Sequence, residues 1–172
     1  MVGFAQADCG LLAEVERWRL ARRLLVSMRA ARSALETRPR DDSLSVALVA
    51  AAVGKGHIAI ARAGRTFAYR LRGAVLTSLC RPGSSPGGAL LEEPVIHVHD
   101  ALAGDAYLLC TAGVVAAVPE EEMRHRLVRS TLPLGACNEL VRIARRRDPT
   151  SDATAVVLRL GPTMSAECGE VS

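Results

Sequence analysis

The chain has 172 residues, of which 49% are hydrophobic and 3% aromatic, so it is long enough to bury one largely aliphatic core. Its 22 basic and 18 acidic residues give a formal net charge of +4 and are spread along the sequence. Proteins that follow nucleic acid cluster their basic residues with stacking aromatics, so nucleic acid is not expected to be the main partner.

The cysteines give no sign of a disulfide framework or a zinc site. They are odd in number and none forms a Cys-x-x-Cys pair; they are Cys9, Cys80, Cys110, Cys137 and Cys168. Free thiols are typical of a reducing compartment. The first residues lack a signal-peptide pattern, and no apolar run reaches the roughly 18 residues of a membrane span. The sequence therefore predicts a soluble cytoplasmic protein without a membrane partner.

The first element predicted along the chain is a long amphipathic helix over residues 11–36. Apolar residues recur there at helical spacing, and arginines and glutamates fall between them. The helix is expected to stop at Arg38-Pro39, because proline excludes the helical conformation for the residue before it.

Short runs suited to β-strands follow, with glycines between them. The runs cover residues 44–52, 56–63, 66–72 and 74–79. Glycine at these intervals predicts hairpin turns and an antiparallel meander. Residues 81–94 are loop by composition, and two further strands are expected at 95–98 and 106–110.

The last third predicts two helices and one strand. The helices cover residues 120–129 and 134–147, and each follows a proline. Residues 154–160 contain an uninterrupted apolar run, which predicts a central strand covered on both faces. Residues 1–160 are thus expected to form a single α+β domain, a layered α-β-β-α sandwich of antiparallel sheets flanked by helices. Residues 161–172 show no periodicity and are expected to be a disordered tail.

Four segments spread over the chain carry a family resemblance. In order, they are FAQADCG at 4–10, GRTFAY at 64–69, GDAYLLCTAG at 104–113 and SDAT at 151–154. They resemble, in the same order, four motifs of the protein phosphatase 2C (PPM-type) family of metal-dependent Ser/Thr phosphatases. Those motifs are a strand ending in Asp-Gly-Met-Gly-Gly, then Gly-Asp-Ser-Arg-Ala-Tyr, then Gly-Asp followed by Leu-Leu-Cys-Ser-Asp-Gly, and finally Asp-Asn-x-Thr.

The resemblance implies two bridged Mg²⁺ or Mn²⁺ ions between two β-sheets, activating a water that attacks phosphoserine or phosphothreonine. Hard divalent cations of this kind need oxygen ligands, chiefly carboxylates. Asp8 matches one metal aspartate of the family, but Cys9 replaces the glycine that follows it. Ala112 stands at the aspartate of Ser-Asp-Gly, and a methyl group coordinates nothing. Ser151 stands at the last metal aspartate, with Asp152 one residue later, where the side chain turns to the opposite face.

Other parts of the family pattern are missing as well. The family's first strand, with its phosphate-binding arginine, has no counterpart in this sequence, and the segment between residues 79 and 94 is too short for the substrate-side flap. Asp8 and Asp152 therefore remain as vestigial candidate metal ligands, beside degenerate positions at Cys9, Ala112 and Ser151. No catalytic residue is identified and no cofactor is expected, with Mg²⁺ or Mn²⁺ as the cofactor if activity persists.

The leading hypothesis is a catalytically inactive phosphatase 2C-like domain that binds protein in bacterial-type Ser/Thr phosphorylation signalling. By resemblance, its partner is a Ser/Thr kinase, the phosphorylated target of that kinase, or a regulator. The absent first strand also leaves a sheet edge unpaired, which invites a partner strand or a homo-oligomer.

The alternative is an active phosphatase with a reorganised metal site. Asp8 and Asp152 would be helped by Glu92 or by His97 and His99, which alternate on one strand with Glu93 and Asp100 nearby. Two histidines on the solvent face of an antiparallel strand are commonplace, however, so a structural role is the default for the pair. Asp105 and Asp152 are expected to serve turns.

Overall fold

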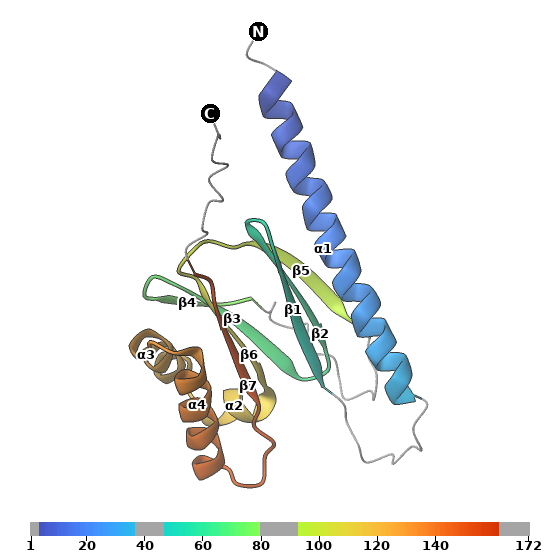
Figure 1. The fold of residues 1–172 in the computed structure, drawn as a ribbon. Coiled ribbons are helices and arrows are strands. Elements are labelled where there is room, and N and C mark those ends of the chain that lie inside the picture. Colours follow the sequence, from blue (N-terminus) through green and yellow to red (C-terminus); the bar gives the residue numbers. More distant parts are fainter. Residues whose placement is uncertain (1–3, 37–46, 80–92, 162–172) are drawn as a thin grey trace, which may run out of the picture.

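The computed structural model describes residues 4–36, 47–79 and 93–161, with side chains from residue 13 onward (Figure 1). The Arg38-Pro39 helix stop lies outside these ranges, as do most of the 81–94 loop and all but the first residue of the predicted 161–172 tail. The elements are α1 (Phe4–Glu36), β1 (Leu48–Gly54), β2 (His57–Ala63), β3 (Thr66–Arg72), β4 (Val75–Ser78), β5 (Val95–Asp100), β6 (Ala106–Thr111), α2 (Ala112–Ala117), α3 (Glu120–Arg129), α4 (Pro133–Arg147) and β7 (Ala155–Arg159).

The strands form two antiparallel sheets instead of one meander. One sheet has the order β1-β2-β5 and the other has the order β4-β3-β6-β7. The four runs expected between residues 44 and 79 are all strands, but β2 and β3 do not pair, so the predicted continuous meander is wrong. The chain changes sheet at Gly64, whose φ of 73° is open to glycine at little steric cost.

Three apolar layers hold the molecule together, which confirms the predicted α-β-β-α order. Helix α1 covers the outer face of the β1-β2-β5 sheet, where Leu24 and Met28 pack on the small side chains of Ala59 and Ala61. A second layer lies between the sheets and joins residues such as Ile58 and Tyr107. Helices α2 to α4 cover the outer face of the other sheet (Figure 1).

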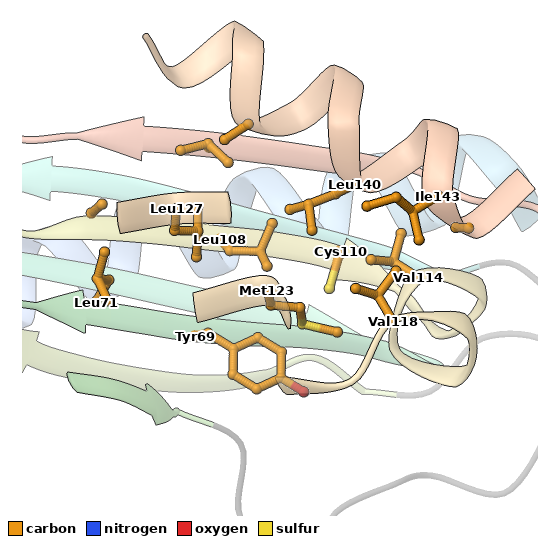
Figure 2. Close-up of a cluster of buried hydrophobic side chains, with 14 residues drawn as sticks. Tyr69, Leu71, Leu108, Cys110, Val114, Val118, Met123, Leu127, Leu140 and Ile143 are labelled. Carbon is orange, nitrogen blue, oxygen red and sulfur yellow. The ribbon is translucent and has the colours of Figure 1, made fainter. Parts of the chain in front are cut away.

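The largest of the three cores lies under the C-terminal helices. Figure 2 shows Leu108 and Cys110 of β6 pointing toward Leu140 and Ile143 of α4, with Met123 and Leu127 of α3 beside them. The apolar residues that recur at helical spacing in 120–129 and 134–147 are therefore those that pack into this core, and both helices lie where the sequence predicts them.

One predicted strand has a different position in its sheet, and one helix was not predicted. Strand β7 is the edge strand of its sheet, not a central one, because β6 is its one neighbour among the described residues. The apolar run of β7 arises because its two faces meet different layers: Val157 packs under the C-terminal helices, and Leu158 packs between the sheets. The short helix α2, which follows β6 without a break, is not predicted by the sequence pattern.

The first helix begins at Phe4, so the segment 4–10 that resembles a family strand is helical. Before Gly10 this segment contains no β-branched residue and is rich in alanine, which favours helix over strand.

Glu93 ties α1 to the start of β5, since its carboxylate accepts hydrogen bonds from Arg29 at 2.8 Å and from Arg32 at 2.7 Å. None of the helices in the described part of the chain has the length and apolar character needed to cross a bilayer.

Candidate functional site

The end of β6 and the segment before β7 meet at one end of the molecule. The Thr111 hydroxyl donates to the Asp152 carbonyl at 3.1 Å and accepts from the Thr154 N–H at 3.0 Å. The Ala112 N–H donates to the Arg65 carbonyl at 3.2 Å. Three of the four segments of the sequence resemblance therefore converge here, around residues 65, 112 and 152.

Gly113 lets these backbones approach closely. A Cβ atom on Gly113 would lie 2.3 Å from the Asp152 carbonyl oxygen and 3.3 Å from the Ser151 Cβ, so only glycine fits without displacing the backbone. Two of the three degenerate ligand positions, Ala112 and Ser151, therefore belong to the segments that meet at this contact.

The Ser151 side chain belongs to a local turn. Its hydroxyl donates to the Asp148 carboxylate at 2.5 Å, and the same carboxylate accepts from the Thr150 N–H at 3.0 Å and from the Thr150 hydroxyl at 2.6 Å. Hydrogen bonds from Ser151 and Thr150 lower the pKa of Asp148 to about 2. The polar groups of this turn are satisfied by one another.

The predicted metal ligands do not come together. Asp152 is exposed, and its carboxylate has no hydrogen-bond or ion-pair partner among the described residues. Asp8 and Cys9 lie in the first turns of α1, and Figure 1 places those turns at the opposite end of the molecule from α2 and the α4–β7 connection. Within residues 13–35, 47–79 and 93–161, no three His, Cys, Asp or Glu side chains are grouped so that they could hold a metal ion.

A buried cation lies close to this junction and was not singled out from the sequence. Arg62 is 6% exposed and shares the inter-sheet face of β2 with Ile58 and Ile60; its Nη1 donates to the Thr66 carbonyl at 2.6 Å. Thr66 pairs with Thr111, the last residue of β6. The lone arginine in the apolar run of β2 was the available signal. A fixed positive charge and an alanine here do not fit a divalent metal pair, which needs carboxylates.

The histidine pair faces the interior, so the expectation of a solvent face is wrong. His97 pairs with Ile60 and His99 with Ile58, and both isoleucines pack between the sheets. The two imidazole centroids are 6.2 Å apart. Burial, and then the neighbouring His97, lower the pKa of His99, which favours its neutral form.

The acidic residues near the histidines have other roles. Glu93 is paired with α1, as described above, and Asp100 lies 3.6 Å from both Arg17 and His57. Glu92 lies outside the described residues. A rebuilt metal site around the histidines therefore has no third ligand in the part of the chain that the structure describes.

Asp105 is a buried structural carboxylate. It is 1% exposed and accepts from Arg72 at 2.8 and 2.7 Å, from the Leu102 N–H at 2.9 Å and from the Tyr107 hydroxyl at 3.1 Å. The Arg72 hydrogen bonds are the main reason that the pKa of Asp105 falls to about 2. Burial, reinforced by Asp105, raises the pKa of Tyr107 to about 12. The expected turn role of Asp105 is thus one part of a larger network.

The fold has close counterparts among solved structures. The Mycobacterium tuberculosis serine/threonine phosphatase PstP matches with a TM-score of 0.69 and 23% identity, over 83% of this chain and 73% of that one. The PPM Ser-Thr phosphatase MsPP from Mycobacterium smegmatis matches with a TM-score of 0.65 and 21% identity, over 90% and 78%. A PstP catalytic domain in complex with two manganese ions matches with a TM-score of 0.63 and 20% identity, over 83% of this chain and 70% of that one.

At the level of sequence, the chain matches no protein-family model and no curated protein. The structural likeness nevertheless confirms the predicted fold class and the resemblance stated above, at the level of the fold. The chain has the fold of the PPM-type, or protein phosphatase 2C, Ser/Thr phosphatases.

Proposed function

We propose that this chain is a catalytically inactive PPM-type phosphatase domain that acts in Ser/Thr phosphorylation signalling by binding protein. The observation that carries the proposal is the junction of Ala112, Gly113 and Ser151. There a methyl group and a hydroxyl bound to Asp148 occupy the positions at which the resemblance requires metal-binding carboxylates.

Two further observations support loss of the metal centre. The segment carrying Asp8 is helical and distant from the junction, and the buried guanidinium of Arg62 lies close to the end of β6. The junction is also well packed and internally hydrogen-bonded, so it needs no ion to hold it together. The alternative is an active enzyme with a reorganised site, and among the described residues of this junction the carboxylate of Asp152 is free to contribute to it.

The test is a metal titration combined with an activity assay on the same metal-stripped protein. A metal bound only by the native state at about 100 times its Kd adds about 2.7 kcal/mol of stability. For a chain of this size that corresponds to a rise in Tm of about 5–11 °C. We expect Mn²⁺ and Mg²⁺ to give neither such a rise nor calorimetric heat, and we expect no phosphopeptide hydrolysis.

A PstP catalytic domain, which is known with two manganese ions, serves as the positive control. Metal-dependent turnover of a phosphoserine or phosphothreonine peptide by this chain would overturn the proposal. Asp8→Asn and Asp152→Asn would then show whether the two predicted ligands carry that activity.

A further inference from the structure

A groove runs between α4 and the outer edge of β7. It encloses about 810 Å³ and is lined on one side by apolar residues of α4, among them Leu134, Cys137 and Val141, and on the other by residues 155–157 of β7. This volume lies in the range of about 300–1,000 Å³ that is typical of binding pockets. Figure 1 shows the helix and the strand that flank it.

The strand side of the groove is an open sheet edge. The backbone groups of Leu160 point inward, toward the segment before β6: its N–H donates to the Asp105 carbonyl at 2.9 Å, and its carbonyl accepts from the Gly104 N–H at 2.8 Å. Backbone groups alternate along an antiparallel strand, so those of Ala155, Val157 and Arg159 point outward. No strand among the described residues pairs with this edge.

Most of this edge lacks the features that usually protect an edge strand. Natural edge strands carry charges, prolines or bulges that discourage pairing with another chain. Residues 155–158 contain neither charge nor proline, and the guanidinium of Arg159, at the end of the strand, donates to the carbonyls of Leu127 and Ser130. Val156 is 46% exposed, and Leu134 across the groove is 68% exposed. The edge and its flank thus present apolar surface beside free backbone hydrogen-bonding groups.

The helix side of the groove carries unpaired positive charge. Arg142, Arg145 and Arg146 line it, all three are exposed, and none has a carboxylate partner in the described ranges. Other arginines of the C-terminal helices are paired: Arg147 lies 2.8 Å from Glu122, and Arg126 lies 3.1 Å from Glu139. The three groove arginines therefore remain available to a ligand.

We propose that the groove binds an extended acidic segment of a partner protein, added as a strand to the edge of β7. The partner backbone pairs with Ala155, Val157 and Arg159, apolar side chains lie against Leu134 and Val141, and Asp or Glu side chains reach the arginines. Strand addition of this kind gives affinity through the backbone and specificity through alternate side chains. Guanidinium forks bind carboxylates in bidentate geometry.

The charge of the groove selects this occupant over two others. A second copy of the chain, paired through the same edge around a two-fold axis, would bring like-charged arginines together, which is unfavourable. Single-stranded nucleic acid binds through stacking on aromatic side chains, and no residue lining the groove is aromatic. The inference rests on the proposed binding function and deepens it by assigning the surface and the class of partner.

The experiment is a selection from a library of random octapeptides displayed against the full chain. We expect the enriched peptides to alternate apolar residues with Asp or Glu. Arg142→Glu/Arg145→Glu is expected to weaken the best peptide at least tenfold, because charge repulsion replaces the ion pairs. The matched control, Arg22→Glu/Arg23→Glu on the exposed side of α1, reverses the same number of charges away from the groove and is expected to leave the affinity unchanged.

Backbone pairing is tested with the peptide itself. N-methylation of alternate amides removes the donors of one face of a strand, so one of the two alternate patterns is expected to abolish binding and the other to retain it. Circular dichroism and the Tm of each protein variant establish that it is folded before its affinity is interpreted.

Three results with the peptides would overturn the inference: enriched peptides without acidic residues, an equal loss of affinity in both double arginine variants, and binding that neither methylation pattern reduces. Three results would assign the groove to another occupant: a dimer formed through β7, an oligonucleotide that binds through the groove arginines more tightly than the peptide, and displacement of the peptide by a synthetic copy of residues 162–172. Hydrolysis of a phosphopeptide in the presence of Mn²⁺, measured on the same sample, reports separately on the proposed inactive state. Peptide binding with turnover would therefore overturn that proposal alone.

Discussion

Replacing Asp105 with alanine is expected to lower the free energy of unfolding by about 3 kcal/mol, because a fully buried carboxylate that accepts four hydrogen bonds is lost. The buried Tyr107 hydroxyl and the Leu102 N–H lose their acceptor, and Arg72, whose side chain is 38% exposed, loses its carboxylate partner. For a chain of this length the corresponding fall in Tm is about 6–12 °C. Urea unfolding followed by circular dichroism measures the change directly.

The matched control is Asp100→Ala at the other side of the same loop. The Asp100 side chain is 69% exposed and lies 3.6 Å from Arg17, so its loss is expected to cost at most about 1 kcal/mol. Equal destabilisation by the two substitutions would contradict the special role of Asp105.

The pH dependence of stability provides an independent test of the same residue. The pKa of Asp105 is about 2 in the folded chain against an ordinary value of 3.8. The folded state therefore gains stability from the ionised carboxylate above pH 3.8, and this gain disappears as the pH falls toward 2. The difference corresponds to about 2 kcal/mol. Asp148 titrates over the same range, so Asp105→Asn is expected to make this part of the stability profile shallower without removing it. An unchanged acid limb would argue against the ion pair.

Most of the architecture could be predicted because each element carries its own local signal. Helices α3 and α4 follow prolines and have helical periodicity, and the turns at Gly56, Gly73 and Gly104 need the positive φ that glycine provides. The pairing of strands carries no such local signal. The separation of β2 from β3 depends on a change of sheet at Gly64, and the edge position of β7 depends on which other strands are present.

The sequence motifs singled out Ala112 and Ser151 without showing how their segments meet. In the structure the two segments come together through the contacts of Gly113 and Thr111 with residues 151 and 152. The strand expected around Asp8 was wrong, since the alanine-rich segment continues α1. The histidines were assigned to solvent because alternation along a strand defines a shared face but not which face meets the second sheet.

Gly113→Ala is expected to destabilise the chain by about 2–3 kcal/mol, the upper part of the range of about 1–3 kcal/mol for forcing an extra methyl group into a packed site. The new Cβ would lie 2.3 Å from the Asp152 carbonyl oxygen, which belongs to backbone and cannot rotate away. The segment at 151–154 must then move off the start of α2. The hydrogen bond between the Thr154 N–H and the Thr111 hydroxyl breaks as it moves, so faster hydrogen exchange of the Thr154 amide is the local signature.

Gly161→Ala is the matched control, because a Cβ at Gly161 meets no atom within 4 Å. It is expected to leave the Tm and the Thr154 exchange rate unchanged. If Gly113→Ala behaved like this control, the junction would be loose enough to accept a side chain. The contact between Gly113 and the Asp152 carbonyl would then not hold the junction together, and a metal ion bound by Asp152 would become the alternative source of its order. Loss of stability confined to Gly113→Ala, with exchange increased at Thr154, instead supports a junction whose order comes from its own packing.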